Sequence, residues 1–304
     1  MSLVFVCCAL AIVFSFAPLS SSKPANRARE LDKYARRLGV AVPAELSDRL
    51  LVRLIRRERA LLTGGLTGIG LAVIAALLLP GGFDAAYVPV LVFAGLGVGS
   101  AVGAALASST SALRPLAGPR VARPTTPVYA DYVPAVERWS GRLLPALAVL
   151  AVFAAWIALS VGALGDARLT AAYIWTSAGA CLAYAAASGL MASALLSRRI
   201  LDRGQPSASA TELAWNDGLR AQALRDLHAV PIVLGFVSLL STFFDIGSLS
   251  DYAGGGATAA AVGVVLLAVL MAGGVTLFIV DLASRPQQYY WRRLWTDRAV
   301  GTSA

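Results

Sequence analysis

The chain has 304 residues, of which 58% are hydrophobic and only 14% are charged. Soluble domains carry roughly 25% charged residues. Together with a mean hydropathy of +0.70, this composition excludes a disordered chain, a collagen-like repeat and an ordinary soluble enzyme. The net charge of +9 would suit nucleic-acid binding only if the basic residues formed one patch on a soluble face. We therefore expect an integral membrane protein.

Seven apolar stretches are long enough to cross a bilayer as helices. A hydrocarbon core of about 30 Å takes about 20 apolar residues. The expected spans are residues 2–19, 61–80, 86–108, 143–163, 170–195, 229–247 and 257–283. The sixth is the weakest, because its uninterrupted apolar core covers only residues 231–244. The predicted fold class is an all-α transmembrane helix bundle with one N-terminal helix and three helical hairpins.

The first apolar stretch has two interpretations. A cleaved signal peptide would begin with basic residues, but residues 1–6 carry no charged side chain. The charged cluster follows the apolar run instead, which is typical of a retained helix with its N-terminus outside. We favour the retained helix and keep a cleaved signal as the alternative.

The basic residues define an orientation. Of the 26 Lys and Arg residues, 25 lie in the segments 20–60, 109–142, 196–228 and 284–304, and Arg168 is the exception. Such an excess marks the cytoplasmic side of the membrane. We expect a multi-pass protein of the cell membrane, with its N-terminus outside, its C-terminus cytoplasmic and no nucleic-acid partner.

The basic segment 21–60 contains two amphipathic stretches, 27–38 and 44–59, which we expect to be helical. In the second, five apolar residues share one face and four arginines the other: Leu46, Leu50, Leu51, Leu54 and Ile55 against Arg49, Arg53, Arg56 and Arg57. Such a helix is expected to lie on the inner leaflet, gaining about 1 kcal/mol per basic residue near anionic lipid. A docking surface for a cytoplasmic partner is the alternative. The aromatic and basic run 289–295 is expected to anchor at lipid headgroups.

The remaining chain divides into three hairpins, each opened by a basic lead-in (43–59, 132–142 and 211–227) and closed near a proline. We treat 1–304 as one membrane domain: an N-terminal helix (1–20), the basic segment (21–60), hairpins at 61–115, 132–206 and 211–286, and a cytoplasmic tail (287–304). An internal duplication and a plain even-numbered bundle explain this pattern equally well.

Glycines recur every fourth residue in two predicted spans, at Gly64 and Gly68 and at Gly95, Gly99 and Gly103. Small residues at this spacing let helix backbones approach closely where lipid supplies no hydrophobic drive. We expect helix packing at these glycines, with a hinge or pore lining as the alternative.

Ionisable residues inside a membrane mark function by default, and the apolar stretches contain almost none. The candidates are Asp245 at the outer end of the sixth span, Asp281 at the inner end of the seventh, and His228 where the sixth span begins. Both aspartates are expected to reach water as terminal polar residues, with a proton site as the alternative. Solvated ion pairs with neighbouring arginines are expected for four cytoplasmic acids: Glu137, Glu212, Asp217 and Asp226.

Several chemistries are excluded by residue type. His228 is the only histidine, which excludes His-rich zinc or haem sites and proteases of the HExxH type. No Gly-x-x-x-x-Gly-Lys phosphate loop occurs, and the hydroxyl residues of the spans have no His or Lys base nearby in sequence. We expect no catalytic residue, metal or cofactor, and therefore not an enzyme.

Three cytoplasmic segments together, 34–40, 123–134 and 224–231, resemble multi-pass membrane proteins of unknown function from actinobacteria. The resemblance covers the cytoplasmic loops alone and implies no catalytic residue.

The long basic loops and the scarcity of polar groups within the spans favour a non-enzymatic scaffold or assembly component that docks partners on its cytoplasmic face, beside anionic inner-leaflet lipids. The alternative is a small-molecule or ion transporter, which would need discontinuous helices and polar groups near the midplane. The oligomeric state and the partner are not determined by the sequence.

Overall fold

The computed structural model describes residues 24–78, 87–110, 126–161, 174–205, 207–252, 272–274 and 288–295. The regular structure of these residues is entirely helical, which confirms the expected all-α class. The helices are α3 (Pro24–Leu38), α4 (Ala44–Leu78), α5 (Tyr87–Thr110), α6 (Tyr129–Tyr132), α7 (Ala135–Ser160), α8 (Ala178–Asp202), α9 (Ala210–Tyr252) and α11 (Tyr289–Leu294).

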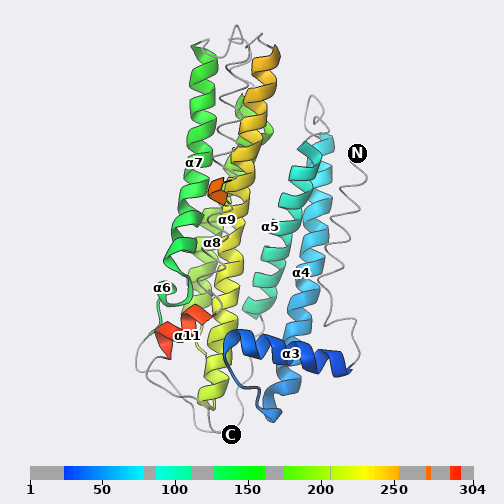
Figure 1. Ribbon diagram of the computed structural model, residues 1–304, viewed down its shortest axis with the longest axis vertical. Helices are drawn as coiled ribbons and strands as arrows, with labels where there is room; N and C mark the ends of the chain where they lie inside the picture. Colours follow the sequence, from blue (N-terminus) through cyan, green and yellow to red (C-terminus); the bar gives the residue numbers. More distant parts are fainter. Residues whose placement is uncertain are drawn as a thin grey trace.

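The helices form two groups (Figure 1). Helices α4 and α5 pack as a pair, α7, α8 and α9 pack as a second group, and α5 joins the groups by packing against α9. Helix α3 crosses the lower end of α4 in this view, and α6 and α11 lie at the same end of the molecule. Every described Lys and Arg belongs to the segments gathered there. We call it the basic end.

The predicted lead-ins are not separate helices. Helix α4 continues through both the basic stretch 44–59 and the predicted span 61–80, and α9 does the same over 211–227 and 229–247. The joins contain good helix formers such as Ala60 and Leu61, so nothing ends the helix there. Leu46, Leu50 and Leu54 of the stretch 44–59 are buried in a core of the protein, so the expectation that this apolar face lies on the inner leaflet is wrong.

Three helices of the described chain are long and apolar enough to cross a membrane: Ala135–Ser160, Ala178–Asp202 and Ala210–Ile246. They contain most of the predicted spans 143–163, 170–195 and 229–247. The predicted spans 61–80 and 86–108 fall largely on α4 and α5. The stretch 2–19, and 257–283 apart from residues 272–274, lie outside the described residues, so the number of seven spans stays a prediction.

The outward faces of α7 and α8 are apolar over most of their length. Leu150 on α7 and Met191 on α8 are both exposed, among many others. A soluble protein rarely leaves so large an apolar surface in water. Towards the basic end this surface reaches exposed arginines, at Arg142 on α7, beyond which Trp139 is also exposed, and at Arg198 and Arg199 on α8. The change from apolar to basic indicates where a lipid-facing surface would meet the headgroups.

The predicted glycine pattern lies where α4 and α5 are in backbone contact. A Cβ atom built on Gly68 would come within 1.9 Å of the carbonyl oxygen of Gly95, and one on Gly64 within 2.2 Å of that of Gly99. A Cβ on Gly103 would meet the Ala60 oxygen at 2.1 Å. Each distance is far below contact, so these positions require glycine for the two helices to pack as they do.

Candidate functional site

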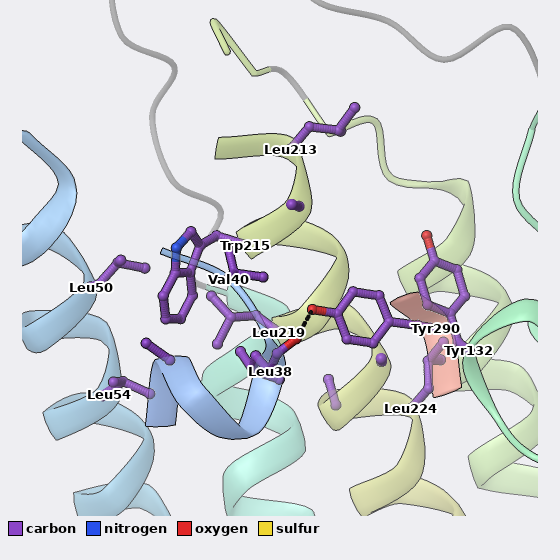
Figure 2. Packing of buried hydrophobic residues seen from close by; sticks show 14 of the residues in the cluster. Leu38, Val40, Leu50, Leu54, Tyr132, Leu213, Trp215, Leu219, Leu224 and Tyr290 are labelled. Carbon is purple, nitrogen blue, oxygen red and sulfur yellow. Dashed lines mark hydrogen bonds between the residues drawn. The ribbon is translucent and has the colours of Figure 1, made fainter. Parts of the chain in front are cut away.

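The basic end contains a large hydrophobic core (Figure 2). It is built mainly from α3, the first turns of α4, and residues 213–227 of α9, with Tyr132 and Tyr290 from α6 and α11. The Trp215 ring lies between α9 and the Leu50 and Leu54 side chains of α4, and its Nε1 donates to the Ala41 carbonyl (2.9 Å). This core is distinct from the smaller hydrophobic clusters that the long helices form between them.

Asp217 ties three elements together at this core. Its side chain is fully buried, and its two carboxylate oxygens accept from the Tyr132 hydroxyl (3.0 Å) and from Trp295 Nε1 (3.2 Å). Burial, and then the Asp217 charge, raise the pKa of Tyr132 above its ordinary value. By accepting these two hydrogen bonds, Asp217 joins α6 and residue 295 to α9. The expectation that Asp217 is solvated is therefore wrong.

The aromatic run 289–295 also serves this core. The Tyr290 side chain is fully buried and its hydroxyl donates to the Leu38 carbonyl (3.4 Å), drawn dashed in Figure 2. Trp295 is buried as well, while Arg292 and Arg293 are exposed. The expectation that this run anchors at lipid headgroups is therefore wrong for Tyr290 and Trp295, whose rings pack inside the protein.

An ion pair between α4 and α9 lies beside the core. Arg57 pairs with Asp226. With the Gln222 amide oriented to satisfy its neighbours, its oxygen accepts from both Nη atoms of Arg57 (3.0 and 3.2 Å), and its nitrogen donates to the Tyr34 hydroxyl. Burial lowers the pKa of Arg57, but the charge of Asp226 and its hydrogen bond raise it, and the net shift is upward. Burial raises the pKa of Tyr34 to about 12. Asp226 thus holds α4 to α9, rather than pairing in solvent with a neighbour in sequence.

A second ion pair joins α9 to α7. Arg225 Nε donates to both carboxylate oxygens of Glu137 (2.7 and 2.9 Å), and its Nη2 lies 2.6 Å from Oε1. This forked geometry is the strongest that arginine offers a carboxylate. Glu137 is therefore held by an arginine 88 positions away.

His228 lies next to this pair and is buried. Its Nε2 is 2.8 Å from the Glu137 carbonyl oxygen, which can only accept, so Nε2 carries the proton and donates. Its Nδ1 then accepts from the Tyr129 hydroxyl at 3.0 Å. A Cβ on Gly141 would come within 2.1 Å of Nε2, so the missing side chain there admits the ring. With both nitrogens occupied, His228 works as a structural link between α6, α7 and α9.

Glu212 belongs to the start of α9. Its Oε2 accepts from the Ala208 N–H (2.7 Å), and its own N–H donates to Ser209 Oγ (3.1 Å). Reciprocal bonds of this kind satisfy the exposed N–H groups of a helix's first turn. The side chain is buried, so the expectation of a solvated pair is wrong here too.

Asp245 lies inside α9, which continues to Tyr252. It is 9% exposed, and its Oδ2 accepts from the Gly179 N–H (3.1 Å) in the first turn of α8. Ser238 Oγ donates to the Gly179 carbonyl (2.7 Å). The carboxylate thus complements the positive end of the α8 dipole. The expectation that Asp245 reaches water as a terminal polar residue is wrong. Asp281 lies outside the described residues.

The burial of acidic side chains leaves the outer surface of the basic end strongly positive. Among the described residues only four acidic side chains are exposed: Asp32, Glu45, Asp48 and Asp202. Twelve basic side chains are exposed over the same residues: Arg29, Lys33, Arg36, Arg37, Arg56, Arg59, Arg142, Arg198, Arg199, Arg203, Arg292 and Arg293. We call these twelve the basic face. In the described part of the chain, no group of His, Cys, Asp or Glu is arranged to hold a metal.

No protein-family model, curated protein or solved structure matches the chain.

Proposed function

We propose that the protein is a non-enzymatic membrane scaffold whose basic face docks an acidic surface of a cytoplasmic or membrane protein. The observation that supports it is the division of charges at the basic end. Four acids there, Glu137, Glu212, Asp217 and Asp226, are buried or held in ion pairs, while basic side chains dominate the outside. A cross-linked core with a predominantly positive surface is suited to steering and orienting an oppositely charged partner.

The proposal includes the placement in the membrane. We infer a seven-span, multi-pass protein of the cell membrane with its N-terminus outside and its basic end in the cytoplasm. The distribution of 25 of the 26 Lys and Arg residues supports this orientation. Arg142, Arg198 and Arg199 would then contact anionic inner-leaflet headgroups, because they are exposed next to the long apolar faces of α7 and α8.

Co-purification in mild detergent tests the docking role. We expect a stoichiometric acidic partner that dissociates as salt is raised. Replacing five basic-face residues by glutamine should remove the partner: Arg29, Arg36, Arg37, Arg292 and Arg293. The matched control neutralises the exposed acids of the same end, Glu45→Gln with Asp48→Asn, and should retain it. A chain that purifies alone, or a partner that survives loss of the five arginines, would refute the proposal.

A transporter is the second candidate, and one observation favours it. Ser238, Ser241, Thr242 and Asp245 line up on the C-terminal part of α9, all buried. The Ser241 and Thr242 hydroxyl oxygens are enclosed without a hydrogen-bond partner among the described residues. Helix α9 is nevertheless continuous through this region, whereas substrate sites of many transporters are formed by broken helices. We therefore prefer the scaffold.

A further inference from the structure

Three arginines form a stripe on α4 toward α9. Arg49, Arg53 and Arg57 are spaced four residues apart and all are partly buried. On a helix such residues are neighbours, with about 5–6 Å between Cβ atoms. Arg57 is neutralised by Asp226. The other two have no ion pair with any described carboxylate.

The contacts of Arg49 and Arg53 are sparse. Arg53 Nη1 donates to Asn216 Oδ1 over a long 3.4 Å, and Asn216 is itself held by its Nδ2, which donates to Ser207 Oγ (3.1 Å). The Nη1 of Arg49 is enclosed and has no hydrogen-bond partner in the described structure. Two partly buried guanidiniums, one helical turn apart, thus retain unused donors.

The electrostatic surroundings agree with this geometry. Burial lowers the pKa of Arg53 to about 10, and the only group opposing it is the Tyr34 hydroxyl. Arg37, Arg53 and Arg57 all act on that hydroxyl, against the single carboxylate of Asp226. A buried cation without a counter-charge is unfavourable, and an enclosed polar group that lacks a partner suggests a missing ion.

We infer that Arg49 and Arg53, with Tyr34 and Asn216 beside Arg53, form a binding site for a phosphate-type oxyanion at the junction of α4 and α9. Guanidinium groups match phosphate oxygens in a forked geometry, and phosphate would supply both the missing charge and the missing acceptors. The site is separate from the basic face, which none of these four residues belongs to. It therefore does not depend on the proposed docking function.

The position of the site favours a water-soluble phosphate over a lipid headgroup. Arg53 precedes the predicted membrane entry at residue 61 by eight residues, which is about 12 Å along a helix. The headgroup layer extends only about 5–8 Å beyond the hydrocarbon edge, so the Arg53 backbone would lie outside it. Inorganic phosphate is accordingly the first probe, and anionic lipid is the second.

The test uses the full chain purified in zwitterionic detergent. Equilibrium dialysis with labelled inorganic phosphate should show one bound per chain, and phosphate should raise Tm above that in sodium chloride of equal ionic strength. Arg49→Gln with Arg53→Gln should weaken binding at least tenfold and abolish the Tm rise. Arg292→Gln with Arg293→Gln removes the same charge from the basic face and should leave both unchanged.

A second arm identifies the source of the phosphate group. The chain is placed in nanodiscs of phosphatidylcholine with or without phosphatidylglycerol. A Tm rise that needs phosphatidylglycerol and the Arg49 and Arg53 side chains would assign the site to a headgroup. The site is refuted if neither inorganic phosphate nor phosphatidylglycerol stabilises the wild-type chain. It is equally refuted if the double variant responds like the wild type. The wild-type measurement decides even if the double variant does not fold.

Discussion

Arg57 and Arg53, one turn apart on α4, should differ strongly in how much stability is lost when each is replaced by methionine. Arg57→Met leaves the Asp226 carboxylate without its counter-charge and takes two hydrogen bonds from Gln222. Breaking a buried ion pair by removing one partner costs about 3–5 kcal/mol. The two side chains keep 16% and 22% of their surface exposed, so water screens part of the loss and we expect about 3 kcal/mol.

Arg53→Met removes a guanidinium of similar burial that has no carboxylate. The lost hydrogen bond to Asn216 is long at 3.4 Å and contributes under about 1 kcal/mol. Removing a desolvated cation offsets that loss. We therefore expect a change near zero, or a small gain in stability, when no phosphate is present.

The assay is equilibrium unfolding of the full chain in phosphate-free mixed micelles. A double variant, Arg57→Met with Asp226→Leu, should recover most of the stability, because an apolar pair replaces the ion pair. Equal changes in the free energy of unfolding for Arg57→Met and Arg53→Met would refute a stabilising Arg57–Asp226 pair. A double variant no more stable than Arg57→Met alone would refute it as well.

Further outcomes follow from packing, titration and topology. Gly99→Ala places a Cβ 2.1 Å from the Gly64 oxygen and should cost about 1–3 kcal/mol, whereas Gly70→Ala, with nothing within 4 Å, should be neutral or stabilising in the same unfolding assay. The pKa of Tyr34 is near 10 in the unfolded chain and about 12 in the folded one. Its contribution to the free energy of unfolding is therefore complete below pH 10 and falls by about 2–3 kcal/mol as pH rises through 12. Tyr34→Phe should flatten this alkaline loss of stability. A reporter fused after residue 120 should read out as cytoplasmic, and an external signal would reverse the orientation.

The local properties of the fold could be predicted from the sequence. Apolar period and run length identify helices because both depend only on neighbouring residues. The glycine spacing likewise predicts the contacting faces of α4 and α5, because each set of glycines lies within a single helix. Composition did not reveal that α4 and α9 continue across residues 59–61 and 227–229, where basic lead-in changes to apolar span. Composition can change along a helix that has no reason to end.

The structural core of the candidate site could not be predicted. The residues that neutralise Asp226 and Glu137 lie 169 and 88 positions away, so nothing near them in sequence reveals the pairing. Asp217 is similar, since its donors come from α6 and from residue 295. The one local signal was the apolar surrounding of residues 213–219, where a polar residue needs a buried partner.

By itself the sequence determined that the chain is apolar, helical and basic mainly between its apolar stretches, because composition, period and charge distribution are properties of the chain alone. Tertiary structure decided where the amphipathic faces go. Leu50 and Leu54 would suit a lipid surface or a protein core equally well, and Trp215 of α9 makes it a core. The same packing of α4 against α9 determines which charged side chains are buried and which remain exposed. Burial and pairing arise only when distant segments meet, so the basic face appears only in the folded chain.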